Sequence, residues 1–210
     1  MSTVTTLKFF KRKINRNILV IKATLTLEKM RRHLEPSKGF HLDKIDKILA
    51  ARELLGIHFF LETGTYLGVT TNYIKNFFTK VYSIELSVDL ANEAADHFKN
   101  NQKVKIIQGD SGLLIEDIIK NNNEKKLFWL DAHYSSGLTA KSVNFGDTPI
   151  SKEVELILKH WVTNSVILID DARHFVGTDN YPHLKDLENF VHSKNLNLKF
   201  FVDKDIIHIF

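Results

Sequence analysis

Cysteine is absent from the 210 residues of this chain. Without thiols there is no disulfide framework, thiolate zinc site, iron–sulfur cluster or cysteine nucleophile. No run approaches the roughly 18 apolar residues that a membrane-spanning helix requires. The basic N-terminus holds one candidate hydrophobic segment, Ile18–Leu27, but Lys22 interrupts it, so we expect no signal peptide. These absences predict a protein of the reducing cytoplasm.

The composition is otherwise that of an ordinary globular protein, with 43% hydrophobic and 26% charged residues. The length allows one domain of ordinary size together with a short extension. The clearest break is Glu35–Gly39, because it contains Pro36 and ends in a glycine, and both residue types interrupt regular structure. We therefore expect a helical arm over residues 1–38 and a single domain over residues 39–210.

Positive charge is concentrated in this arm. Residues 1–33 hold nine lysines and arginines against one acid, Glu28, whereas the other 177 residues hold twenty bases and twenty-four acids. A basic arm can attract nucleic acid, an acidic partner or an anionic membrane, the last through residues 8–33. It can equally be a solvated helix that packs on the domain, or an arm exchanged between the subunits of a homodimer.

From residue 57 onward, short apolar runs alternate with helical patterns, and an amphipathic helix over residues 42–55 precedes them. Five apolar runs are each followed by a helical stretch, and two further runs close the chain. The seven runs are residues 57–61, 81–84, 104–107, 127–130, 166–169, 198–202 and 206–210. Repeated strand–helix units imply a parallel sheet with helices on both faces. The sequence thus predicts a doubly wound α/β fold with a mostly parallel, seven-stranded sheet and a C-terminal antiparallel hairpin.

Acidic residues follow the expected strands, where an open parallel sheet binds its ligands. The first run leads into Glu62-Thr63-Gly64-Thr65-Tyr66-Leu67-Gly68, whose glycines allow a tight turn and close approach to a ligand. Glu85 lies 21 residues after Gly64, where a carboxylate can accept hydrogen bonds from two ribose hydroxyls. The later strand ends carry Asp110 and Ser111, then Asp131 and His133, then Asp170 and Asp171. One such acid alone would be an ordinary turn residue, but the ordered set predicts a ligand site.

With these residues the sequence resembles the class I S-adenosylmethionine-dependent methyltransferases over about residues 55–210. The glycine-containing segment looks like their first motif, and the closing hairpin matches their reversed last strand. The resemblance implies a Rossmann-like fold and a bound methyl donor. The cofactor-binding residues that it implies are Glu62, Gly64, Thr65, Tyr66, Gly68, Glu85, Asp110 and Ser111. Tyr66 stands where the superfamily often has a third glycine, and the G-x-x-x-G spacing differs from the nicotinamide fingerprint G-x-G-x-x-G.

The acids after the fourth and fifth runs resemble those of the metal-dependent, macrocin-type sugar O-methyltransferases. In that family an Asp and a following Asp-Asp pair hold magnesium, which implies Asp131, Asp170 and Asp171 here. Three neighbouring carboxylates repel one another unless a cation, protonation or hydrogen bonds compensate, and magnesium prefers oxygen ligands. His133 occupies the position of that family's base for the sugar hydroxyl, and Arg173 is expected to face the acceptor or to pair with a carboxylate.

The sequence therefore predicts an enzyme that methylates a hydroxyl of a small molecule or glycan, with magnesium and Asp131 at the reacting oxygen and His133 as general base. Residues 134–147 have the length of a lid or binding loop, with Lys141 or Asn144 as acceptor contacts. A nucleic-acid methyltransferase is the first alternative, although the acids oppose a polyanion and no Asn-Pro-Pro-Tyr-like motif is present. A non-catalytic adaptor or membrane-surface protein is the second, and a nicotinamide oxidoreductase is disfavoured by the glycine spacing.

Overall fold

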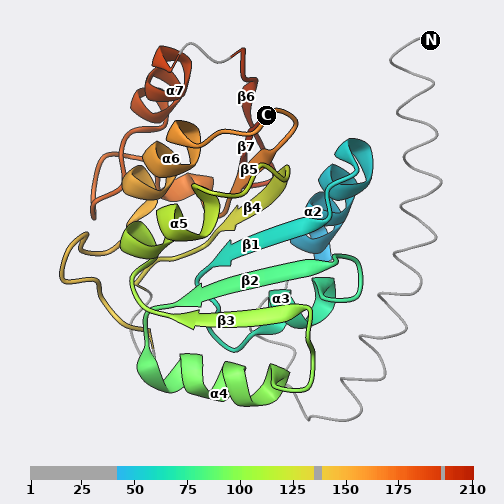
Figure 1. Ribbon diagram of the computed structural model, residues 1–210. Coiled ribbons are helices and arrows are strands. Elements are labelled where there is room, and N and C mark those ends of the chain that lie inside the picture. The colour runs from blue at the N-terminus through green and yellow to red at the C-terminus, as the bar shows by residue number, and fades with distance from the viewer. Residues whose placement is uncertain (1–41, 135–138, 195–196) are drawn as a thin grey trace.

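The computed structural model describes residues 42–134, 139–194 and 197–210 (Figure 1). The predicted arm over residues 1–38, and the first three residues of the predicted domain, lie outside this range. None of the described helices is long and apolar enough to cross a membrane.

A seven-stranded sheet forms the centre of the molecule, with the strand order β3-β2-β1-β4-β5-β7-β6. The first five strands are parallel, and β7 pairs antiparallel with both β5 and β6. The strands are β1 (Phe59–Thr63), β2 (Lys80–Glu85), β3 (Val104–Gln108), β4 (Lys126–Leu130), β5 (Val166–Ile169), β6 (Phe200–Asp203) and β7 (Ile206–Ile209). The predicted Rossmann-like, doubly wound fold with its closing hairpin is confirmed.

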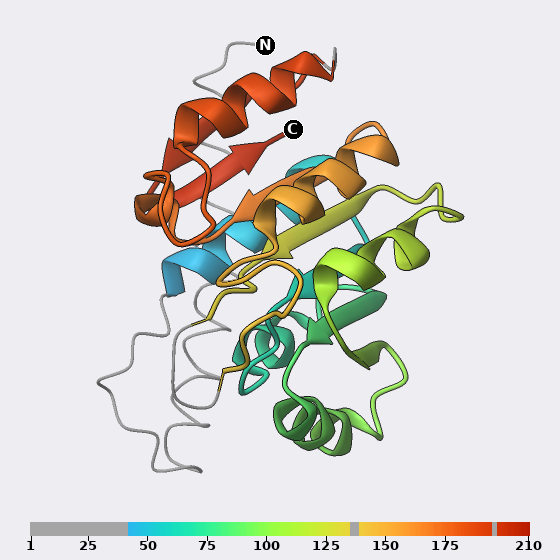
Figure 2. The ribbon, with the colours of Figure 1, turned by 90° about the vertical axis from the view of Figure 1, so that its left-hand side faces the viewer.

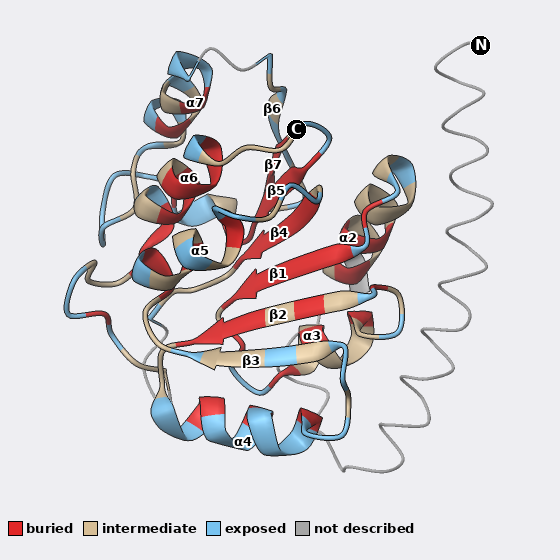
Figure 3. Cartoon of the chain, in the orientation of Figure 1, coloured by how far each residue is buried: buried red, intermediate tan, exposed pale blue. Residues whose placement is uncertain are grey.

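Helices cover both faces of the sheet (Figures 1 and 2). One face packs against α2 (Leu42–Leu55) and α3 (Val69–Ile74), and the other against α5 (Ser111–Ile119), α6 (Ile150–Lys159) and α7 (Leu184–Ser193). The helix α4 (Val88–Phe98) runs beside the β3 edge, and the short 3₁₀ helix η1 (Ala172–His174) follows β5. The central strands are buried on both faces, as Figure 3 shows, which accounts for their continuous apolar runs.

Successive side chains along β1 point to opposite faces of the sheet. Phe59 and Leu61 belong to the core beneath α5, α6 and α7, whereas Phe60 belongs to the core beneath α2 and α3. Because successive side chains point to opposite faces, Glu62 follows Phe60 towards α3 and Thr63 follows Leu61 towards α6. The two polar residues at the end of β1 therefore have different surroundings.

The first strand begins two residues later than the apolar run predicts. Ile57 is fully buried, but its backbone N–H donates to the Arg52 carbonyl at the end of α2, at 3.0 Å, and not to a neighbouring strand. Ile57 was predicted to begin the strand because its side chain is apolar, but that side chain is buried in the core beneath α2 and α3 without the residue joining the sheet. As a correction, Glu62 and Thr63 lie inside β1, and the turn begins at Gly64.

The helices α3 and α6 border the site. The helix α3 ends at Ile74, and the ring of Phe78, four residues later, is buried in the core beneath α2 and α3. Pro149 stands just before Ile150, the first residue of α6, and this helix ends at Lys159. The hydroxyl of Thr148 accepts the Ile150 N–H at 3.3 Å, so it satisfies one backbone donor at the start of the helix.

Candidate active site

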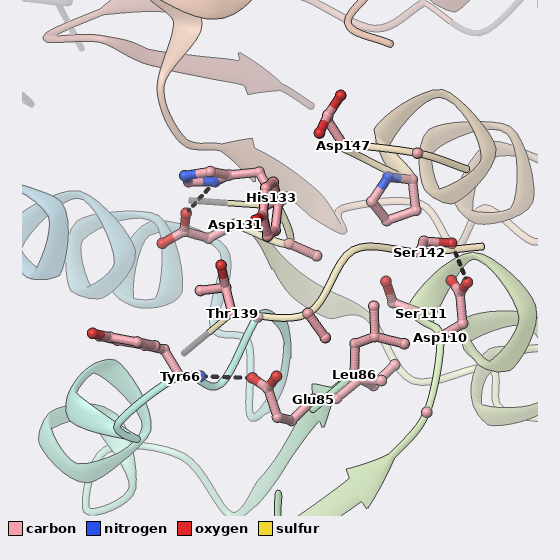
Figure 4. Close-up of a pocket in the computed structure, with 18 residues that line it drawn as sticks. Tyr66, Glu85, Leu86, Asp110, Ser111, Asp131, His133, Thr139, Ser142 and Asp147 are labelled. Atoms are coloured by element: carbon pink, nitrogen blue, oxygen red, sulfur yellow. Dashed lines mark hydrogen bonds and ion pairs between the residues drawn. The ribbon is translucent and has the colours of Figure 1, made fainter. Parts of the chain in front are cut away.

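A cavity of about 310 Å³ opens at the carboxyl edge of β1, β2, β3 and β4 (Figure 4). This volume lies in the range of small-molecule and cofactor pockets. Seven of the residues predicted from the sequence line it: Gly64, Tyr66, Glu85, Asp110, Ser111, Asp131 and His133. The loop over residues 139–149 forms the opposite wall. The fold thus brings together predicted residues that are up to 69 positions apart in the sequence.

The turn after β1 requires glycine at its first position. Gly64 has φ +83°, and a Cβ built there would lie 2.4 Å from the backbone carbonyl oxygen of Asp131. No side chain fits in that gap, so the turn and the end of β4 meet backbone to backbone. Tyr66, where the superfamily often has glycine, also adopts the left-handed region, at φ +48°. A cofactor that lies along this turn therefore meets backbone groups at Gly64 and an aromatic side chain at Tyr66.

Glu85 ends β2 with its carboxylate held in place by backbone donors. The N–H of Tyr66 donates to one carboxylate oxygen at 2.8 Å, and the N–H of Ser87 donates to the other at 2.9 Å. Each oxygen keeps a further lone pair for a ligand hydroxyl. The side chain borders the cavity (Figure 4), in the arrangement expected for a ribose-binding acid.

Asp110 connects the cavity to the loop on its far side. One carboxylate oxygen caps α5 by accepting the Gly112 N–H at 3.1 Å, and the other accepts the Ser142 hydroxyl at 2.6 Å. Asn144 also donates to Asp110, at 3.3 Å, and Lys141 pairs with Asp147 at 2.9 Å. These contacts hold the loop against the cavity. No sequence motif points to Ser142, because only the folded chain brings it to Asp110.

Three predicted cofactor residues lie behind the turn and do not line the cavity. Glu62 is buried and accepts hydrogen bonds from the hydroxyls of Ser83, at 2.6 Å, and Thr71. Thr65 shares a hydrogen bond with Ser83, and Gly68, at φ +69°, leads into α3 against the ring of Phe98. Burial raises the pKa of Glu62 to about 7, although these hydroxyls act against the shift. In the structure these residues support the turn from within the core.

A second buried acid, Glu153, lies behind the cavity on α6. Its side chain is fully buried, close to the hydroxyls of Ser111 and Thr63, and burial raises its pKa to about 7. The sequence contains a signal for it, because Glu153 falls among Ile150, Val154 and Ile157 on the apolar face of its helix. An acid on such a face indicates a carboxyl group that folding buries, as it does here.

His133 lies on the cavity wall, directly after β4. Its Nδ1 is 3.3 Å from Asp131 (Figure 4), and its Nε2 is 3.7 Å from Asp171. The hydrogen bond to Asp131 raises the pKa of the imidazole, while partial burial acts to lower it. The ring centroid of His174 is 6.3 Å away, and His174 in turn stacks on Tyr181 at 5.6 Å. Nothing in the sequence points to Tyr181, since the segment after η1 carries no motif.

The carboxylates of Asp170 and Asp171 are bound by cationic side chains of the chain itself. Lys44 of α2 pairs with Asp170 and lies 3.8 Å from Asp171. Arg173 pairs with Asp171 at 2.9 Å and also with Asp205, which favours the second of its predicted roles, as the partner of a carboxylate. Burial and the charge of Asp131 push the pKa of Asp170 upward, and Lys44 opposes them. Burial also acts to lower the pKa of Lys44, but its acidic partners outweigh it and the net shift is upward.

The predicted magnesium ligands are not brought together as a set. Among the described residues, the group whose ligand atoms lie within 4.8 Å of one another is Asp131, His133 and Asp171, with His133 in the place of Asp170. A donor set that includes an imidazole suits transition metals better than magnesium, which prefers oxygen ligands. Lys44 already binds Asp170. The residues present therefore do not fit the magnesium site implied by the resemblance.

Solved structures with a similar fold include a putative O-methyltransferase from Klebsiella pneumoniae, with 14% identity and a TM-score of 0.57 over 90% of this chain and 88% of that chain. An SAH-bound methyltransferase from Podospora anserina matches with 14% identity and a TM-score of 0.57 over 100% and 96%. The O-methyltransferase from Bacillus cereus, in complex with SAH, matches with 17% identity and a TM-score of 0.56 over 94% and 89%. At these identities the likeness shows the fold. No curated protein matches the sequence.

Residues 42–161 match the sequence family described as ribosomal RNA adenine dimethylase, and the chain belongs to that family. Together with the sheet order, this match defines a class I S-adenosylmethionine-dependent methyltransferase, an enzyme that transfers a methyl group. The superfamily and the methyl donor predicted from the sequence are thereby confirmed.

Proposed function

We propose that this enzyme methylates a hydroxyl group of a small molecule or glycan, with His133 as the general base. The observation that carries the proposal is the imidazole of His133 on the cavity wall, oriented by Asp131 at 3.3 Å. A hydroxyl oxygen becomes a good nucleophile only when its proton is removed, and a histidine near neutral pH is suited to accept that proton.

S-adenosylmethionine, when bound, supplies a methyl group that is already electrophilic because it is attached to a sulfonium sulfur. The chain's own residues then have two tasks, which are to hold the reactants in line and to remove a proton. The turn at Gly64 and the carboxylate of Glu85 would hold the cofactor. Ser111 and Asp110 border the same cavity and would complete the cofactor site.

The position of Asp131 defines how His133 would act. A carboxylate beside Nδ1 favours the tautomer with a proton on that nitrogen, so Nε2, which lies 3.7 Å from Asp171, carries the lone pair that would accept the proton of the acceptor. His174, whose ring centroid is 6.3 Å from that of His133, and Tyr181, on which His174 stacks, would form the acceptor wall. Magnesium assistance, expected from the sequence, is not used in this proposal, because Lys44 binds Asp170 and the donor set is mixed.

Methylation of an adenine amino group in ribosomal RNA is the second candidate, and the family match over residues 42–161 favours it. An amine needs no prior deprotonation, so this reaction gives His133 no task as a base. The segment after β4 reads Asp131-Ala132-His133-Tyr134, unlike an Asn-Pro-Pro-Tyr motif. The acids at the strand ends also disfavour a polyanion beside the cavity.

The first test is calorimetric titration of the full chain with S-adenosylhomocysteine. We expect micromolar binding that Glu85→Ala weakens by at least about tenfold, because the ribose hydroxyls lose their acceptor. Asp89→Ala, which removes an exposed acid nearby on α4, is the matched control and should bind as the wild type does. A folded protein that binds no cofactor product would contradict the methyltransferase site.

The second test follows labelled methyl groups from S-adenosylmethionine into sugar and phenol hydroxyls and, in parallel, into ribosomal RNA. His133→Ala should slow O-methylation by roughly 100-fold with unchanged S-adenosylhomocysteine affinity. The wild-type rate should rise with pH through a pKa above 6.5, because Asp131 stabilises the protonated imidazole, and Asp131→Asn should move that rise to lower pH. Transfer to RNA alone would establish the second candidate instead.

A further inference from the structure

A lysine from outside the predicted motifs reaches the carboxylates beside the active site. Lys44 lies in the first turn of α2, and its partner Asp170 follows β5, 126 residues later in the sequence. The side chain of Asp170 is almost completely buried, at 1% exposure, while that of Lys44 is 30% exposed. The helix α2 thus brings one positive charge to a buried acid at the carboxyl end of β5.

Both acids of the pair are held by donors of this chain on several sides. Asp170 accepts the backbone N–H of Asp171 at 2.9 Å in addition to the ammonium of Lys44. Asp171 accepts Arg173 at 2.9 Å and lies 3.8 Å from Lys44, with His133 at 3.7 Å on its other oxygen. A divalent ion that bound both acids would have to displace the ammonium of Lys44 from Asp170.

The contacts to Lys44 and Arg173 hold the Asp171 carboxylate beside His133. The backbone of Asp171 has φ +57° and ψ +49°, a left-handed conformation that aspartate adopts more readily than most other residues with a side chain.

We propose that Lys44 is the resident cation of this acid cluster, in place of a divalent metal, and that it positions Asp170 and Asp171 beside His133. Lys44 is then a positioning residue, and the enzyme works without added metal. The activity measurements that test this role of Lys44 rest on the proposed function, because they need a methyl acceptor. The metal titration needs no acceptor and tests the role independently.

The same helix offers a matched control. Lys47, one turn after Lys44, pairs with Asp203 of β6, whose side chain is 43% exposed and lies outside the cavity lining. Lys47→Met removes an equivalent charge from the same helix without touching the acid pair. Lys44→Arg keeps the charge at the site, and Lys44→Met removes it at similar side-chain length.

The deciding experiment is calorimetric titration of the chelator-treated full chain with Mg²⁺ and with Mn²⁺ at neutral pH. We expect the wild type, Lys47→Met and Lys44→Arg to bind neither ion with a Kd below about 1 mM. Lys44→Met, whose acids have lost their cation, should bind Mn²⁺ at least about tenfold more tightly than the wild type. Wild-type binding of either ion below about 1 mM, or no gain of affinity in Lys44→Met, would overturn the proposal.

Activity supplies a second readout. Wild-type methyl transfer should survive the chelator, and Lys44→Met should lose at least about tenfold in kcat with S-adenosylhomocysteine affinity unchanged, while Lys44→Arg keeps most of the rate. Loss of wild-type activity in chelator, restored by a divalent ion, would also overturn the proposal. If no hydroxyl acceptor is methylated at all, the proposed function fails, and the metal titration still decides the role of Lys44. Should Lys44→Met not fold, the wild-type and Lys44→Arg titrations keep the test decisive.

Discussion

Some carboxylates of this protein face the cavity and can bind a ligand, whereas others are buried in the core. The surroundings of each carboxylate determine which of the two it is. Glu85 lines the cavity with backbone donors on both oxygens, so it can accept ligand hydroxyls. Glu62 and Glu153 are fully buried, and burial raises the pKa of each to about 7. A buried acid is more easily accommodated as the neutral carboxyl, because the desolvation penalty falls on the charged form.

Glu153 should therefore make stability depend on pH. Its pKa is about 7 in the folded protein and 4.5 ordinarily, so the stability contributed by the neutral carboxyl is complete below 4.5 and is lost as pH rises to about 7. Glu153→Gln cannot ionise and should exceed the wild type in free energy of unfolding by roughly 2 kcal/mol at about pH 8. Urea unfolding of both proteins at about pH 5 and about pH 8 measures the difference.

The control for this prediction is Glu155→Gln, two residues along the same helix. Glu155 pairs with Lys152 and its side chain is 46% exposed, so its substitution should leave the pH dependence of stability as in the wild type. Equal pH dependence in Glu153→Gln and the wild type would contradict the buried, neutral state of Glu153.

At the scale of elements, the site depends on how β1 turns into α3. The turn lies against the end of β4 so closely that Gly64 and the Asp131 carbonyl leave no space for a Cβ. The same contact places Asp131 and His133, which follow β4, beside the cofactor cavity. Close packing of two strand ends thus joins the cofactor-binding part of the site to its catalytic part.

Gly64→Ala should disrupt both parts. The new Cβ would meet the Asp131 carbonyl at 2.4 Å in a backbone conformation that disfavours side chains, so we expect a loss of about 2 kcal/mol or more in the free energy of unfolding. Affinity for S-adenosylhomocysteine should fall by at least about tenfold. Urea unfolding and calorimetric titration measure the two effects.

Gly56→Ala is the matched control for this substitution. Gly56 has a similar φ of +59°, but a Cβ there would meet only the flexible end of Lys125 at 3.6 Å. It should cost only the backbone strain, about 1 kcal/mol, and leave cofactor-product binding unchanged. Equal effects of the two substitutions would show that close approach to Asp131 is not what Gly64 provides.

On the scale of the whole molecule, the sheet order determines which strand ends meet. Placing β1 and β4 side by side at the centre, with β2 and β5 on their outer sides, gathers the acids of four strands at one edge. Charge is distributed unevenly along the chain, because the basic residues 1–33 precede a domain with an excess of acids. The cytoplasmic location, the homodimer and the membrane contact through residues 8–33 stay predictions.

The basic segment should bind anionic membranes. We expect the full chain to sediment with vesicles that contain phosphatidylserine and to be released as salt rises well above 0.1 M, where electrostatic screening acts within about 10 Å. Neutral phosphatidylcholine vesicles, and a chain that lacks residues 1–38, are the controls and should show no binding. A full chain that ignores anionic vesicles would remove the membrane from its partners.

The sequence by itself determined the fold class and most of the cofactor cavity. Strand–helix alternation and the order of the strand-end acids depend on local chain chemistry, so Gly64, Glu85, Asp110 and Asp131 were predicted to share one edge, and they do. Only the tertiary structure decided which of those acids face the cavity. Glu62 turns into the core because β1 extends to Thr63, so Glu62 lies inside the strand and on the same face as Phe60.

The tertiary structure also decided which side chains contact the residues of the site. Ser142 on Asp110, Tyr181 beside His174 and Lys44 on Asp170 are contacts between segments 7 to 126 residues apart in the chain. No periodicity or short motif encodes such pairs, because they form only where packing brings separate elements together. The sequence predicts a metal site from three acids, whereas in the fold one of these acids, Asp170, is paired with Lys44 of the same chain.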